Sequence, residues 1–182
     1  MKVIDQEIAS LKNSISEMWA LVHQQLYNAG EAMLTGDKEL AYKVISRERR
    51  VNAFELKIDS DCEDIIALYA PVAVDLRFVL AMYKINTNLE RLGDFAESIA
   101  RFAGNLPEGV PVDPQLIKDT RVEEMLQELL SMLTLSQEAF EKESSEIASR
   151  IFLKDNLIDE INHNSTRIIA DYIEKHPGSA LV

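Results

Sequence analysis

The sequence repeats itself at a fixed offset of 107 residues, and this repeat limits what the chain can fold into. When the sequence is shifted by 107 residues, its two halves align without a gap. The aligned stretch begins where Met18 matches Met125 and ends where Val51 matches Ile158. Apolar residues meet apolar residues along most of this stretch, and acidic positions recur as well. Such a chain is expected to fold as two similar units built from the same elements in the same order.

The spacing of apolar residues predicts long helices in both units. In the first unit apolar residues recur at three- and four-residue intervals over residues 3–34 and 38–69. Gly36 is placed for a left-handed turn between these helices, and Asp37 can cap the second of them. A third helix is predicted from Asp75 to about residue 103. The second unit has helical spacing over residues 115–142 and 146–175.

These helices predict an all-α fold class, with one complete three-helix bundle followed by a helical hairpin. The first repeat covers residues 1–104, and a linker rich in proline and glycine covers residues 105–114. The second repeat covers residues 115–182 and ends before its third helix. By analogy with the first repeat, we expect one more helix of roughly 30 residues to complete it.

Charge and cysteine content exclude several classes of protein. The formal net charge of −12 disfavours binding to nucleic acid or to anionic lipid, because like charges repel. Cys62 is the only cysteine, which excludes a disulfide framework and a thiolate metal site. We expect Cys62 to be a buried, inert thiol. The N-terminus has no signal-peptide pattern, and no segment approaches the roughly 18 apolar residues of a membrane span. A cytoplasmic protein is the resulting expectation.

Two pairs of carboxylates are the strongest candidates for a functional site. Glu55 and Asp59 are four residues apart on the second predicted helix, and Glu90 and Asp94 are four apart on the third. Residues at this spacing share one helix face. Glu55 lies about 24 Å before the turn at Pro71, and Glu90 lies about 22 Å along the returning helix, at 1.5 Å per residue. The two pairs should therefore meet at one level.

Four unneutralised carboxylates at one level raise one another's pKa values, and a bound cation would remove this penalty. An all-oxygen set of ligands suits hard cations such as Mg²⁺, Ca²⁺, Mn²⁺ or iron. The alternative is that these acids are ordinary solvated faces of helices.

Other charged patterns do not add a catalytic site. Glu160 and His163 form a single Glu-x-x-His, whereas di-iron bundles need two copies on separate helices. No glycine-rich phosphate loop and no nucleophile beside a base occur in the sequence. Arg77, Lys84 and Arg91 recur every seven residues, a spacing that suits either ion pairs within the helix or an anion site. We therefore predict no enzymatic activity.

One segment resembles a known family. Residues 89–94 read Leu-Glu-Arg-Leu-Gly-Asp and closely resemble the Leu-Glu-Arg-Ile-Gly-Asp signature of PhoU proteins, with Leu92 in place of the commoner isoleucine. The resemblance extends over the whole chain, including the repeat. Further residues that match the family's pattern are Glu55, Asp59, Pro71, Asp75, Leu76, Arg77, Lys84, Ala96 and Ile99.

The resemblance implies two three-helix bundles that carry surface clusters of metal ions, typically iron or zinc. It assigns the ligands of the first cluster to Glu55, Asp59, Glu90 and Asp94. A second copy of the signature would fall after residue 182, so only part of a second metal site is expected. Asp155 and Asp159 are the best candidates for that part.

The resemblance also implies a function. Proteins of this family are cytoplasmic and often homo-oligomeric, and they contact the membrane only through partners. They act as metal-binding regulatory adaptors that negatively control phosphate uptake and phosphate-starvation signalling. Their partners are the ATPase subunit of the phosphate ABC transporter and a phosphate sensor kinase. Two alternatives are a cytosolic PhoU-like domain of a sodium–phosphate cotransporter and a di-iron helical-bundle enzyme. The cotransporter would need a preceding membrane region, and the start at Met1 counts against it.

Overall fold

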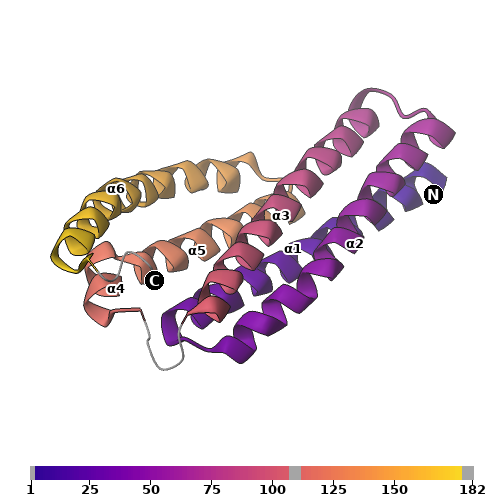
Figure 1. The fold of residues 1–182 in the computed structure, drawn as a ribbon. Coiled ribbons are helices and arrows are strands. Elements are labelled where there is room, and N and C mark those ends of the chain that lie inside the picture. The colour runs from indigo at the N-terminus through magenta and orange to yellow at the C-terminus, as the bar shows by residue number, and fades with distance from the viewer. Residues whose placement is uncertain (1–2, 107–111, 178–182) are drawn as a thin grey trace.

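The chain is described by a computed structural model that covers residues 3–106 and 112–177. Helices dominate these residues, and no strand occurs among them. Figure 1 shows three long helices side by side, with the later helices packed against one flank of this group. The six helices of the described residues are α1 (Val3–Thr35), α2 (Lys38–Tyr69), α3 (Ala73–Asn105), α4 (Pro114–Thr120), α5 (Val122–Glu141) and α6 (Ser145–Lys175).

The first three helices form a bundle in which each helix packs on the other two. Their buried apolar side chains recur at intervals of three and four residues, so each helix presents one apolar seam to the bundle axis. Cys62 belongs to this core and is fully buried, and burial raises the pKa of its thiol to about 12. The centre of the core contains Leu11, Ile15, Met18, Val22, Val51, Ile58, Ile65, Val79, Met82 and Leu89.

The turn between α1 and α2 has the same backbone design as the turn between α5 and α6. After α1, Gly36 takes a positive φ of 72°, and the Asp37 side chain accepts a hydrogen bond from the Leu40 amide. At the position 107 residues later, Glu143 has a φ of 52° and Ser144 caps α6. The prediction of a left-handed turn followed by a capping residue is confirmed at Gly36 and Asp37. The repeat therefore extends to backbone conformation.

The predicted organisation of the second half is wrong. We expected one complete bundle and then a two-helix hairpin, but the second half contains three helices, and the helical fold covers nearly the whole described chain. The expected helix over residues 115–142 is broken at Arg121, which has a φ of 53°. The segment before it starts with its own cap, because the Asp113 side chain accepts from the Gln115 amide and Pro114 occupies the first turn.

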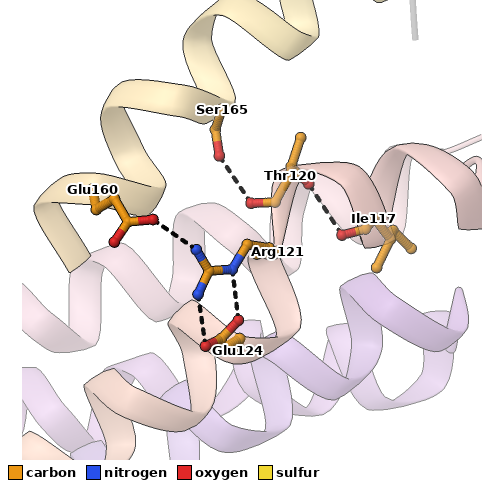
Figure 2. A network of polar contacts seen from close by, with 6 residues as sticks. All are labelled: Ile117, Thr120, Arg121, Glu124, Glu160 and Ser165. Atoms are coloured by element: carbon orange, nitrogen blue, oxygen red, sulfur yellow. Dashed lines mark hydrogen bonds and ion pairs between the residues drawn. The ribbon is translucent and has the colours of Figure 1, made fainter. Parts of the chain in front are cut away.

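Contacts with α6 explain why α4 does not continue into α5. Ser165 on α6 donates its hydroxyl hydrogen to the Thr120 carbonyl at 2.9 Å, as Figure 2 shows. The Arg121 guanidinium pairs with both oxygens of Glu124 and reaches Glu160 on α6 at 3.0 Å. These contacts hold the break in place, whereas the apolar spacing of the sequence runs through it without interruption. The further helix expected after residue 182, and residues 107–111 of the predicted linker, lie outside the described residues.

The two halves are joined mainly where α5 lies along α1. The Trp19 indole nitrogen donates to the Leu133 carbonyl at 3.2 Å, and the Trp19 ring stacks on Phe140 with centroids 5.7 Å apart. Lys12 and Glu143 form an ion pair at the end of the same interface. Among the described residues, no later helix packs along α2 or α3 in the way that α5 packs along α1. Within the described ranges, no helix is long and apolar enough to cross a bilayer.

Candidate functional site

The packing of α2 on α3 brings acids of the two predicted pairs near enough to act on each other's charge. Burial raises the pKa of Glu55, and the charges of Asp59 and Asp94 raise it further. Burial also raises the pKa of Glu90, with added effects from Asp94 and Glu55. Because acids from both helices act on each other, Glu55 and Glu90 share one region of negative charge. Their partly buried position makes this repulsion stronger than it would be in water.

Gly93 allows the two helices to approach each other at this site. A Cβ atom placed on Gly93 would lie 2.8 Å from Cγ1 of Val51, which is fully buried on α2. Valine has little rotamer freedom in a helix, so it could not move aside. Glycine within the signature segment therefore has a packing role, and it lies between the two acids Glu90 and Asp94 in the sequence.

Asn86 links the two helices at the level of Asp59, and the sequence analysis missed it. Its side chain is fully buried, and its Nδ2 donates to the Glu55 carbonyl at 2.9 Å and to Asp59 Oδ1 at 2.7 Å. Its Oδ1 has no hydrogen-bond partner among the described residues. A buried polar atom without a partner costs free energy unless something binds it. Asn86 is therefore part of the site as well as of the core.

The acidic region extends beyond the two predicted pairs. Glu48 is only 8% exposed, and burial together with the charges of Glu97 and Asp94 raises its pKa. Asn52 donates its Nδ2 hydrogen to Glu48 Oε2 at 2.9 Å. We call the resulting set of polar side chains the acidic stripe, and it follows the α2–α3 contact. The acidic stripe consists of Glu48, Asn52, Glu55, Asp59, Asn86, Glu90, Asp94 and Glu97.

The donor atoms of the acidic stripe fit a hard divalent cation, because they are all oxygens and nearby carboxylates repel one another. In the side-chain positions of the described residues, however, no three His, Cys, Asp or Glu side chains converge closely enough to hold one ion. The metal assignment of Glu55, Asp59, Glu90 and Asp94 therefore stays a prediction.

The other predicted site residues lie apart from the acidic stripe. Asp155 and Asp159 are both exposed on α6, in the second half of the chain. Glu160 is engaged by Arg121, and His163 is exposed. The assignment of Asp155 and Asp159 as part of a second metal site likewise stays a prediction.

Comparison with known proteins identifies the family. The family model described as "PhoU domain" matches residues 15–103 and 122–181. The chain is 32% identical over 172 residues to "Phosphate-specific transport system accessory protein PhoU homolog" of Aquifex aeolicus, which covers 94% of this chain and 76% of that protein. It is also 32% identical over 167 residues to "Phosphate-specific transport system accessory protein PhoU" of Escherichia coli, covering 92% of this chain and 68% of that protein.

Two solved structures are similar over nearly the whole chain. PhoU from Pseudomonas aeruginosa superposes with a TM-score of 0.88 at 26% identity, covering 95% of this chain and 81% of that one. The phosphate transport system regulatory protein PhoU from Streptococcus pneumoniae has a TM-score of 0.84 at 28% identity, with 95% and 80% covered. The fold and the signature together define an all-helical bundle protein of the phosphate-regulator class. The chain belongs to the PhoU family, as its sequence resemblance predicted.

Proposed function

We propose that this chain is a regulatory adaptor of phosphate uptake that works by binding metal and partner proteins. The observation that carries the proposal is the signature segment 89–94, whose acids face the acids of α2. The relatives in Aquifex aeolicus and Escherichia coli are named accessory proteins of the phosphate-specific transport system. A role in regulating phosphate transport follows from membership of this family.

The metal part of the proposal rests on the electrostatics of the acidic stripe. Glu55, Asp59, Glu90 and Asp94 would hold a divalent cation, with iron or zinc favoured by the family resemblance. When bound, the cation would neutralise these acids and cross-link α2 to α3. Asp155 and Asp159 would contribute to a second, partial site on α6.

The regulatory part concerns partners. The chain would restrain phosphate uptake and starvation signalling through contacts with the ATPase subunit of the phosphate ABC transporter and with the phosphate sensor kinase. It would do so in the cytoplasm, as a homo-oligomer, without nucleic acid and without catalysing a reaction. Occupancy of the acidic stripe would keep α2 and α3 rigid.

Thermal unfolding with added metal tests the metal part. Iron, zinc, manganese or magnesium should raise the melting temperature of the wild type, because an ion that binds only the folded state stabilises it by about 2.7 kcal/mol at a hundredfold excess over Kd. Asp94→Ala and Glu55→Ala should lose most of this gain and keep the fold. Glu123→Ala, which removes an exposed acid of α5, should keep the full gain. No gain for the wild type with any of these ions, in protein purified without metal, would exclude the metal site.

Phosphate uptake in cells tests the regulatory part. Deleting the gene should raise uptake of labelled phosphate and expression of a phosphate-starvation reporter when phosphate is abundant. The wild-type gene should restore both to the starting level, and the Glu123→Ala gene should do so equally well. Uptake and reporter levels that do not respond to the deletion would contradict the adaptor role.

A further inference from the structure

The turn between α2 and α3 has a strained backbone. Ala70 ends α2 at φ 45° and ψ 55°, and Ala73 begins α3 at φ 49°. Residues other than glycine avoid this left-handed region, at a cost of about 1–3 kcal/mol each. Pro71 lies between the two alanines and is buried, so the turn is fixed in shape. Strain of this kind persists where the shape of a segment has a use.

The same turn exposes aliphatic side chains. Leu68 is 72% exposed, and Val72 and Val74 are each 73% exposed. We call residues 68–74 the apolar tip. Figure 1 places the α2–α3 turn at the end of the first bundle that is remote from α4. Several large aliphatic side chains gathered in water on one rigid turn are typical of a surface that is covered by a partner.

An acidic pocket lies beside the apolar tip. Glu7 on α1 and Asp61 and Asp64 on α2 line a pocket of about 220 Å³, together with Leu68 and Tyr69. Lys57 pairs with Asp61 and neutralises one of the three carboxylates. The pocket therefore keeps a net negative charge next to an apolar surface, and Leu68 belongs to both.

We propose that the apolar tip and the adjoining acidic pocket form one docking surface for a protein partner. The partner presents an apolar depression that takes Val72 and Val74, and beside it an arginine or lysine that enters the acidic pocket. Arginine fits best, because its planar fork can bond two carboxylates at once. This inference rests on the proposed function, in which the partner belongs to the phosphate transporter. An anionic membrane is a poorer match, because the carboxylates would face lipid of their own charge.

Binding to the purified phosphate ABC transporter of the same organism, held in lipid nanodiscs, tests this surface. The double variant Val72→Ser, Val74→Ser should weaken binding by about tenfold or more, because exposed anchors that become buried dominate interfaces. The double variant Phe152→Ser, Leu153→Ser is the matched control, since these α6 side chains are 75% and 77% exposed. It should bind like the wild type. All four positions are exposed, so neither double variant removes buried packing. Val72 is the N-cap of α3, where serine is a preferred residue, so the melting temperature of the tip variant should not fall.

The charge of the pocket is tested separately with Asp64→Lys. This variant should weaken binding to the nanodisc-held transporter and flatten its dependence on salt, because it removes an attraction that salt screens. If the wild type binds the transporter, and the tip variant and the pocket variant bind it with the same affinity, the docking surface is overturned. The proposed function then stays intact. Failure of the wild type to bind the transporter overturns both. Tip-dependent binding to vesicles of phosphatidylcholine and phosphatidylglycerol, without the transporter, overturns the protein partner in favour of lipid.

Discussion

The two halves of the chain carry one repeated pattern, yet they bury it to different extents. On α2, Val44 and Val51 are fully buried, whereas their repeat partners on α6, Ile151 and Ile158, are only partly buried. The helix α3 explains the difference, because it lies against both α1 and α2 along their length. Among the described residues, no long helix covers both α5 and α6 in this way. The short helix α4 packs on both of them, and part of α1 packs on α5. An apolar pattern offers a surface for burial, and the neighbouring helix determines how much of it is buried.

The electrostatic surroundings of the acidic side chains also differ between the two halves. In the first bundle, Glu55 and Glu90 lie near other carboxylates, and burial and repulsion raise their pKa values. In the second half, a hydrogen bond from Arg121 lowers the pKa of Glu124, and one from Lys142 lowers the pKa of Glu138. Paired acids stabilise the fold at neutral pH, and repelling acids destabilise it until a cation binds. The comparison therefore separates acids that are paired with basic side chains from acids that repel one another.

The largest expected effect comes from truncating matched core positions. Met18 is fully buried in the first bundle, and its repeat partner Met125 is partly buried beside a pocket in the second half. Met18→Ala should lower the free energy of unfolding by about 2–5 kcal/mol, because it leaves a cavity in a closed core. Met125→Ala should cost about 1 kcal/mol, as expected for a partly exposed site. Urea unfolding followed by circular dichroism measures both, and equal losses would show that the two halves are equally well packed.

Most of the first bundle could be predicted from the sequence, because its helices follow the three-and-four spacing of Ile15, Met18 and Val22. The turn at Gly36 could also be predicted, since a left-handed glycine before a capping acid is a local signal. The break at Arg121 could not be predicted. It depends on contacts with Ser165 and Glu160 of α6, more than thirty residues away.

The candidate site was predictable in part. The spacing of Glu55 with Asp59, and of Glu90 with Asp94, placed the four acids at one level of α2 and α3. Asn86 was missed, although it continues the buried seam that includes Met82 and Leu89. A polar residue at such a seam position was the available signal, as it was for Glu48 on α2. The atoms that Asn86 contacts depend on the approach of α2, and no local pattern encodes that approach.

Removing Asn86 should have the next largest effect. Asn86→Ala leaves the Asp59 carboxylate and the Glu55 carbonyl without their donor, which should cost about 1–3 kcal/mol of unfolding free energy. Asn88→Ala is the matched control on the same helix. Its side chain is exposed and bonds only the Lys84 carbonyl, so its cost should be near zero. The measurement is the urea midpoint of metal-free protein at pH 7.

The variant Asn86→Asp makes this prediction sharper. It replaces the amide donor with a carboxylate beside Asp59, so metal-free protein should lose more stability than with Asn86→Ala. If the acidic stripe binds a cation, added manganese should recover more of the loss in Asn86→Asp than in Asn86→Ala. A purely structural Asn86 would give two variants with the same response to metal.

The smallest effect is the dependence of stability on pH, and its sign should differ between the two halves. The pKa of Glu90 in the folded protein is raised above its ordinary value of 4.5, mainly by burial and by Asp94. The stability that Glu90 contributes is therefore full below pH 4.5 and is lost as the pH rises through the raised pKa. Glu90→Gln cannot undergo this loss, so without metal it should gain stability relative to the wild type as the pH goes from 4.5 to 7.

Glu124 in the second half should show the opposite trend. The hydrogen bond from Arg121 lowers the pKa of Glu124, so its contribution is present above its ordinary pKa of 4.5 and is lost as the pH falls through the lowered value. Glu124→Gln should therefore be less stable than the wild type at pH 7 and approach it at low pH. The effect should be small because the pair is exposed and screened by solvent. Urea midpoints of both variants between pH 3.5 and pH 7 measure the two trends. Trends of the same sign would mean that the acids of α2 and α3 are already neutralised in the metal-free protein. The acidic stripe would then have no charge repulsion for a cation to remove.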